Sequence, residues 1–140
     1  MAVLFPFELH TPYRLFFSDM VEAIVLTLID GEVGVYANHT AFTAPVVPCL
    51  IKIKGKDGNW KSAFTAEGIL EVKEHKTVLI SDAAEWPEEI DMKRAKDARD
   101  RAETALADGT FRFERESTAL SLKRAKMRIK AGEEELKSTH

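Results

Sequence analysis

The chain has 140 residues, the size of one ordinary domain or of one small domain with an appendage, which excludes two large domains. Apolar residues make up 45% and charged residues 31%, a balance that excludes a disordered chain and a membrane-embedded one. The formal net charge of -3 is too small to indicate a partner, and the single Cys49 excludes an intramolecular disulfide, so we expect a reducing compartment.

The N-terminal part of the chain predicts a β-sandwich or barrel. Its apolar stretches are short, rich in β-branched and aromatic residues, and bounded by Gly, Pro, Asp or Asn. About nine strands at this spacing are typical of those two architectures. Asp57-Gly58 indicates a hairpin turn between two of them. The expected strands cover residues 3–9, 13–17, 21–29, 32–36, 42–47, 50–54, 59–66, 69–72 and 76–81.

The composition changes near Pro87. Ten of the twelve aromatic residues precede it, together with 7 Lys/Arg and 11 Asp/Glu. The remainder of the chain holds 13 Lys/Arg and 12 Asp/Glu, and alanine replaces most of the large apolar side chains. This composition indicates exposed helices, so we place the boundary between two regions at residues 86 and 87.

The C-terminal region predicts an antiparallel pair of helices. Asp91 is suited to cap the first, because its carboxylate can accept the free backbone N–H groups of the opening turn. Asp108-Gly109 is expected to end that helix, and a second is expected from about residue 113 to residue 136, with Gly132 as a weak point. The expected contact residues are mostly small: Met92, Ala95, Ala98, Ala102, Ala105 and Leu106, then Leu120, Ala125, Met127 and Ile129.

Such a hairpin is expected to be marginally stable. A seam made chiefly of alanine buries little area, and at ~25 cal/mol per Å² it contributes only a few kcal/mol against the entropy of ordering the two helices. A marginal hairpin on a stable β-domain is suited to docking, undocking or extending.

The second predicted helix concentrates positive charge. No Asp or Glu occurs from residue 117 to residue 132, whereas Lys123, Arg124, Lys126, Arg128 and Lys130 do. Arg124 and Arg128 repel each other at four residues' separation, which costs a little helix stability. Three interpretations are open at this point: a solvated basic face, an anionic ligand, or an acidic protein surface.

Hairpin geometry favours an anion among the arginines. Arg94 and Arg101 are seven residues apart and share a helix face, and folding back at residues 108–109 brings Arg94 roughly level with Arg124 and Arg128. Four guanidinium groups would then surround one anion. An extended hairpin would instead offer its basic helix to an acidic protein partner.

Four stretches occur in the order found in one known family. They are GEVGVYANHTAFTAPV (31–46), GILEV (68–72), VLISDAAE (78–85) and EIDMKRA (89–95), followed by the predicted hairpin. Each fragment alone is weakly specific, whereas the ordered set is strongly specific. Over essentially its whole length, the chain therefore resembles the epsilon subunit (epsilon chain) of bacterial F-type ATP synthase.

This resemblance implies an α+β fold, with a rotor-binding β-sandwich of about ten strands (1–86) and a regulatory two-helix hairpin (87–140). It implies a non-catalytic central-stalk subunit that couples proton translocation to ATP synthesis and inhibits ATP hydrolysis through the hairpin. The implied partners are the gamma subunit, the c-ring and the alpha/beta catalytic head, without nucleic acid. The implied location is peripheral, on the cytoplasmic face of the bacterial inner membrane, which the subunit meets only through the complex.

The resemblance also implies site residues. No cofactor is required, but ATP is a candidate regulatory ligand of the compact hairpin. Glu32 and His39 are implied to contact the rotor ring, although a structural role for a loop histidine is the simpler interpretation. Carried over position by position, the ATP site comprises Glu85, Asp91, Arg94, Ala95, Arg101, Arg124 and Arg128, and all seven hold the expected residue type.

Three short stretches depart from the family pattern. ANHT at 37–40 keeps the histidine but lacks the family's preceding proline and glycine, so the conformation of this loop is open. Glu67 stands where the family has glycine, and nothing in the sequence explains that change. Pro87 at the junction is expected to restrict Trp86.

Two other classes of function are weighed against this assignment. An independent enzyme is disfavoured, because the four histidines share no metal-ligand spacing and no nucleophile motif is evident. A module that binds nucleic acid or an acidic protein through the basic second helix is the alternative. The acids of the hairpin nearly equal its bases in number, which argues against nucleic acid.

Overall fold

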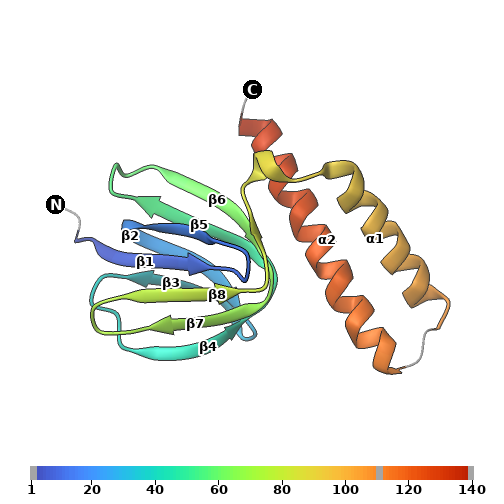
Figure 1. Ribbon diagram of the computed structural model, residues 1–140, viewed down its shortest axis with the longest axis horizontal. Coiled ribbons are helices and arrows are strands. Elements are labelled where there is room, and N and C mark those ends of the chain that lie inside the picture. Colours follow the sequence, from blue (N-terminus) through green and yellow to red (C-terminus); the bar gives the residue numbers. More distant parts are fainter. Residues whose placement is uncertain (1–2, 110–111, 139–140) are drawn as a thin grey trace. The chain divides into compact units, whose positions relative to one another are not determined.

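The computed structural model describes residues 3–109 and 112–138. The chain divides into two compact units, Met1–Glu85 and Trp86–His140. The first is built from strands and the second from helices (Figure 1).

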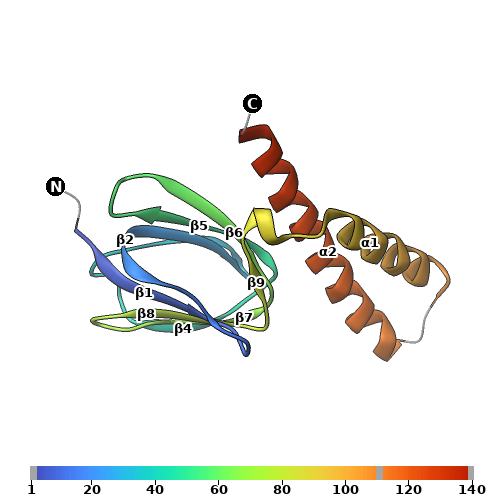
Figure 2. The same ribbon diagram turned by 45° about the horizontal axis from the view of Figure 1, so that its top comes forward.

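The strands of the first unit form one sheet that folds into two layers. They are hydrogen-bonded in the order β1-β8-β7-β4-β2-β5-β6-β9, with β3 paired to β2. Because β1 also pairs with β2, the sheet closes on itself, and Figure 2 shows its two facing layers. The predicted β-sandwich is therefore confirmed. Within the described residues the strands are β1 (Phe5–His10), β2 (Leu15–Leu28), β3 (Gly31–Tyr36), β4 (Phe42–Val46), β5 (Cys49–Gly55), β6 (Trp60–Thr65), β7 (Gly68–Val72), β8 (Thr77–Ser81) and β9 (Ala84–Glu85).

The alternation of buried and exposed side chains shows which face of each strand points into the core. Along β1, Phe5, Phe7 and Leu9 are buried and the residues between them are part-exposed. Since successive side chains point to opposite faces of a strand, one apolar set fills the space between the layers. The Phe7 ring lies 5.8 Å from that of Phe17 on β2. Each such side chain contributes about 1.5–3 kcal/mol when it is fully buried.

Two strand predictions differ from the structure. The expected strands at 13–17 and 21–29 are parts of one long strand, β2. Residues 18–20 are exposed and break the apolar alternation, but β1 pairs with them and keeps the backbone extended. The two-residue β9 was not predicted, because it is too short to carry a pattern.

The predicted hairpin between β5 and β6 is present. Gly55 donates its backbone N–H to the carbonyl of Asn59, and Gly58 adopts a φ of 81°, in the left-handed region that glycine enters without strain. Asp57 Oδ1 accepts the backbone N–H of Asn59, which further fixes the turn.

The second unit contains the two predicted helices, α1 (Met92–Ala107) and α2 (Arg112–Ser138), preceded by a short 3-10 turn, η1 (Pro87–Glu89). Helix α1 packs along α2 as an antiparallel hairpin (Figure 1). Gly109, with a φ of 75°, follows the end of α1 as expected. Helix α2 continues through Gly132 to Ser138.

Candidate anion-binding hairpin and docking surface

The hairpin begins with the segment EIDMKRA. Trp86 has extended backbone, as expected before Pro87, and Glu89 turns back to accept the Trp86 N–H at 2.9 Å. Asp91 then caps α1, because its Oδ1 accepts the backbone N–H of Arg94 at 3.1 Å. The predicted cap is confirmed, and it sets where α1 starts.

The seam between the helices consists largely of alanine. Ala95 and Ala102 of α1 are 4% and 6% exposed, and Ala125 and Ile129 of α2 are 1% and 7% exposed. Alanine has no side chain beyond Cβ, so this seam buries far less apolar area than the core of the sandwich. The predicted small-residue contact is therefore present.

Each of these four seam residues directly follows an arginine: Arg94, Arg101, Arg124 and Arg128. Successive residues are rotated by about 100° around a helix axis. Each arginine is therefore displaced from its buried seam residue by the same angle and in the same direction around its own helix. An antiparallel helix pair is related by a two-fold axis perpendicular to its plane, which places such positions on the same side. The four arginines therefore share one side of the hairpin.

The residues that follow the seam lie on the opposite side. By the same rotation, Lys96 of α1 and Lys126 and Lys130 of α2 point away from the arginine side, and all three are exposed. These lysines are thus separated from the arginine cluster although they are its neighbours in sequence.

The contact between Met92 and Gly132 sets the level of one helix against the other. Each step from Met92 toward the turn is matched by a step back along α2, which places Arg101 about level with residue 123 and Arg94 about level with residue 130. Arg124 and Arg128 therefore lie between the levels of Arg94 and Arg101. The cluster extends over about two helical turns.

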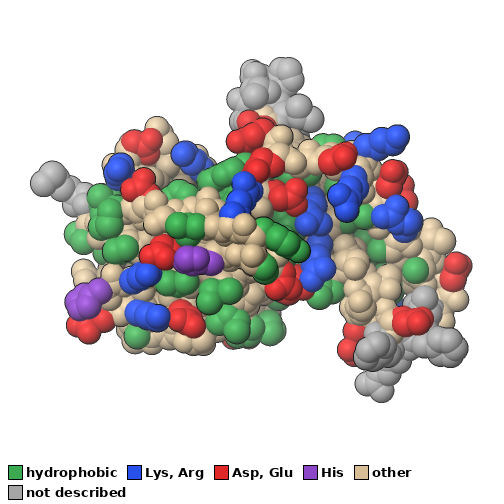
Figure 3. Space-filling model, in the orientation of Figure 1, with side chains coloured by type: hydrophobic (Ala, Val, Ile, Leu, Met, Phe, Trp, Pro, Cys, Tyr) green, Lys and Arg blue, Asp and Glu red, His purple; other side chains and the backbone are tan. Residues whose placement is uncertain are grey.

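The arginines of α1 and those of α2 differ in exposure and in their interactions. Arg94 and Arg101 are exposed, and within the described part of the chain neither side chain forms an ion pair. Arg124 and Arg128 are part-buried and interact within the structure. Figure 3 shows Lys and Arg side chains gathered over the helices. An anion with several oxygens would supply the two exposed guanidinium groups with charge-assisted hydrogen bonds.

The other predicted ATP residues are placed as follows. Asp91 caps α1 and Ala95 lies in the seam. Glu85 is part-exposed and belongs to the first unit, where it ends β9 opposite Phe64 of β6. Six of the seven predicted residues thus share the hairpin unit.

Glu32 and His39 lie at opposite ends of β3. Glu32 is exposed opposite Thr27, just after the β2–β3 turn. His39 follows the far end of the strand, where its Nδ1 lies 2.8 Å from the Thr40 carbonyl oxygen and its ring 5.2 Å from that of Phe42. The four-residue step from Glu32 to Tyr36 along β3 alone spans about 13 Å, and His39 lies beyond the turn that follows, so the structure does not bring the two side chains together.

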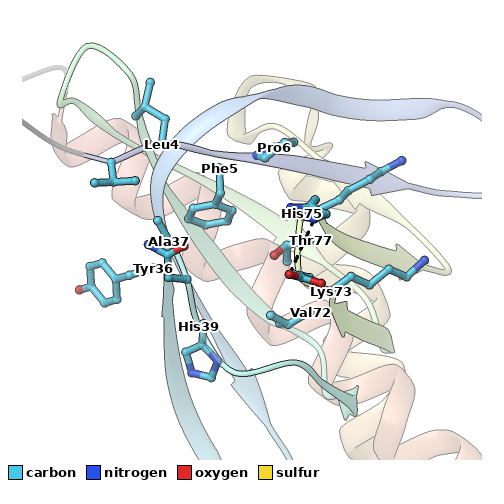
Figure 4. Close-up of a pocket in the computed structure, with 14 residues that line it drawn as sticks. Leu4, Phe5, Pro6, Tyr36, Ala37, His39, Val72, Lys73, His75 and Thr77 are labelled. Carbon is cyan, nitrogen blue, oxygen red and sulfur yellow. Dashed lines mark ion pairs between the residues drawn. The ribbon is translucent and has the colours of Figure 1, made fainter.

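A hollow of about 190 Å³ lies beside His39 at this end of the sandwich. It is lined by the start of β1, by residues 36–39 and by the turn between β7 and β8 (Figure 4). Phe5 and Val72 give it apolar walls, while Lys73 and His75 are exposed at its rim. The Tyr36 ring points away from it (Figure 4).

An apolar row, not predicted from the sequence, crosses the outer surface of one layer. Its apolar members are Pro45 of β4, Ile69 of β7, Ile80 of β8 and Leu15 of β2, and His10 of β1 is the cross-strand partner between Ile80 and Leu15. Ile69, Ile80 and Leu15 are 49%, 50% and 54% exposed. Figure 3 shows hydrophobic side chains over this face. The adjacent isoleucine and leucine in ILEV were the signal, since they make both faces of β7 apolar.

A charged cluster borders the apolar row. Lys76 Nζ donates to Glu8 Oε2 at 2.6 Å, and His10 Nε2 lies 2.7 Å from Glu8 Oε1. The hydrogen bond from Lys76, followed by that from His10, lowers the pKa of the Glu8 carboxyl. Glu8 is therefore held as a carboxylate beside His10.

Comparison with known proteins decides the family. The family model described as "ATP synthase, Delta/Epsilon chain, beta-sandwich domain" matches residues 4–87, and "ATP synthase, Delta/Epsilon chain, long alpha-helix domain" matches residues 88–133. The ATP synthase epsilon chain of Caldicellulosiruptor bescii is 47% identical over 93% of this chain and 94% of its own length. The chain belongs to the ATP synthase epsilon chain family.

Solved structures related to this epsilon chain share its fold. A chain of the Euglena gracilis mitochondrial ATP synthase (OSCP/F1/c-ring, rotational state 1) matches with a TM-score of 0.76 and 18% identity, covering 88% of this chain and 78% of that one. A chain of the Tetrahymena thermophila mitochondrial ATP synthase central stalk/c-ring matches with a TM-score of 0.61 and 13% identity, covering 94% and 98%. No helix among the described residues is long and apolar enough to cross a membrane.

The structure accounts for two departures from the epsilon family pattern. Asn38, in place of a glycine, has a φ of 64°, and asparagine tolerates this left-handed region better than most residues. Next to Glu67, a β-carbon on Gly68 would overlap the Ile80 carbonyl oxygen, so this glycine is required. Glu67 is part-exposed, so its side chain has room, and its backbone carbonyl accepts the N–H of Asp82.

Proposed function

We propose that this epsilon chain is a non-catalytic rotor subunit that couples proton translocation to ATP synthesis and inhibits ATP hydrolysis through its C-terminal hairpin. ATP bound to the arginine side of the compact hairpin favours the non-inhibitory form. Release of the hairpin then allows it to extend toward the alpha/beta head. Membership of the family supports this proposal.

The observation that carries the regulatory part is the pairing of a weak seam with four arginines on one side. The alanine seam stabilises the closed hairpin only modestly. Arg94 and Arg101 of α1 lack ion pairs within the described residues, and only the closed hairpin places Arg124 and Arg128 of α2 beside them, so an anion that contacts both helices binds the closed form better. A ligand shifts an equilibrium by its difference in affinity for the two states, and here that difference comes from assembling arginines of both helices.

Titration of ATP into the full chain, followed by calorimetry, tests the arginine site. Arg94→Ala and Arg128→Ala are each expected to weaken binding by about tenfold or more, since each removes charge-assisted hydrogen bonds. Lys96→Ala and Lys130→Ala are the matched controls, because each removes one positive charge from the opposite side. Equal losses in all four variants would show attraction by overall charge and would sink the site.

The rotor assignment rests on a different surface. We assign the apolar row as the docking surface for gamma, since several large apolar side chains exposed on one face favour a protein partner. The end of the sandwich beside Glu32 is assigned to the c-ring. Contact with the membrane, on its cytoplasmic face, is then indirect and made through the complex.

Co-purification tests the rotor assignment. The native chain is expected to join a gamma-containing complex, and Ile80→Glu is expected to prevent this by placing a charge in the apolar row. Trp60→Glu is the control, because Trp60 is also 50% exposed but lies on β6 in the other layer. Failure of the native chain to associate would refute the assignment, and an equal loss with Trp60→Glu would refute the docking surface.

A further inference from the structure

A methionine fills the notch left by a glycine where the helices cross. Met92 is the first residue of α1, and Gly132 lies in the last third of α2. A β-carbon built on Gly132 would overlap Met92 Sδ, and it would lie 3.1 Å from Cε and 3.3 Å from Cγ. The thioether therefore occupies the space that any other residue at position 132 would fill with its own side chain.

Among the described residues, the surface that α2 presents to Met92 at this contact is apolar. Gly132 contributes no side chain, and its backbone N–H points back along the interior of α2. Its neighbours in the described seam, Ala131 at 0% exposure and Ile129 at 7%, are apolar. A polar atom introduced on the sulfur would therefore lose part of its hydration where the sulfur faces Gly132, and this cost lasts while the helices stay closed.

We propose that Met92 is an oxidation-sensitive latch of the hairpin. A hydroperoxide transfers one oxygen atom to the thioether sulfur: an S–O bond forms, the O–O bond breaks, sulfur is oxidised by two electrons, and the peroxide is reduced to water or an alcohol. Met92 is part-exposed, so a small peroxide reaches it. The sulfoxide is polar and bulkier at the very atom that touches Gly132, so oxidation opens the helices.

Opening of the hairpin on oxidation does not depend on what the hairpin regulates. Its meaning for the enzyme rests on the proposed function: an opened hairpin loses the arginine side and enters the extended, inhibitory form. Methionine sulfoxide reductases restore the thioether, so the latch is reversible.

Amide hydrogen exchange of the full chain, with peptide mass spectrometry, tests the latch. After treatment with hydrogen peroxide, protected amides of α1 are expected to exchange about tenfold faster or more, while strands of the sandwich are unchanged. Met92→Leu, which keeps the apolar volume but has no thioether, is expected to abolish the response. Met20→Leu is the matched control: Met20 is 39% exposed on β2, so it is oxidised readily without affecting the hairpin.

Three outcomes would overturn the latch. The first is that peroxide still accelerates amide exchange in Met92→Leu. The second is that amide exchange of α1 stays unchanged in protein whose mass shows one oxygen on Met92. The third is that methionine sulfoxide reductases fail to restore slow exchange. Should Met92→Leu itself open the hairpin, Met92→Gln provides an independent test: as a polar mimic of the sulfoxide it must open the helices without peroxide. ATP titration of the same samples reports on the arginine site separately, so failure of that site leaves the exchange result interpretable.

Discussion

The two units of this epsilon chain are stabilised in different ways. In the sandwich, large side chains such as Phe7, Leu9 and Leu79 are 0% exposed and pack between two layers that close on themselves. In the hairpin, the seam consists mainly of Ala95, Ala102 and Ala125. Because stability from burial scales with apolar area, we expect the sandwich to be the more stable unit and the hairpin to open at a lower free-energy cost.

The largest expected effect comes from creating a cavity in the core of the sandwich. Phe7→Ala removes a fully buried ring that packs near Phe17, and we expect the free energy of unfolding of the sandwich to fall by about 3–5 kcal/mol. Urea denaturation followed by circular dichroism measures it. Leu15→Ala, on the exposed apolar row, is the control and should change stability by no more than about 0.5 kcal/mol. A small change in the free energy of unfolding for Phe7→Ala would mean that the sandwich is not the more stable unit.

A larger side chain in the alanine seam should destabilise the hairpin without destabilising the sandwich. Ala125→Leu inserts a branched side chain at a position that is 1% exposed, and we expect it to favour opening by about 1–3 kcal/mol. Hydrogen exchange should then accelerate in α1 and not in the strands. Ala119→Leu makes the same change at an exposed position of α2 and should leave exchange unaltered. Acceleration in the sandwich as well would show that the two units unfold together.

The smallest expected effect concerns acid stability of the sandwich. The pKa of Glu8 is lowered below its usual value near 4.5, first by the hydrogen bond from Lys76 and then by that from His10. A lowered pKa gives stability that is present above that value and lost as the pH falls through the lowered pKa. Lys76→Ala should therefore lessen the loss of stability at acid pH, as measured by thermal melting across a pH series. Lys73→Ala, which removes a lysine paired with Glu71 nearby, should retain the native slope.

Local signals in the sequence predicted much of this fold. Asp91 caps α1 through a residue three positions away, and Gly58 and Gly109 supply positive φ at turns, so neighbours along the chain suffice to identify them. Merging of the strands at 13–17 and 21–29 was missed because pairing with β1, a tertiary contact, holds the exposed residues between them in the strand.

The residues of the candidate site could be named from the sequence, whereas their arrangement in space required the structure. The spacing of Arg94 and Arg101 shows their shared face, but the common side of all four arginines follows only from the burial of the residue after each. The sequence marks Gly132 only as a residue of low helix propensity, and it does not show that a methionine forty residues earlier fills its notch. The apolar row was missed because its members come from different strands.

The position of the Met92–Gly132 contact has a mechanical consequence. It lies at the base of the hairpin, and the 16 residues of α1 form a lever about 24 Å long. A tilt of about 20° at this base carries the far end of α1 through about 8 Å. If oxidation opens the hairpin as proposed, a small displacement at the Met92 sulfur would be amplified along α1. The 27 residues of α2 would then give the released hairpin a further reach of about 40 Å.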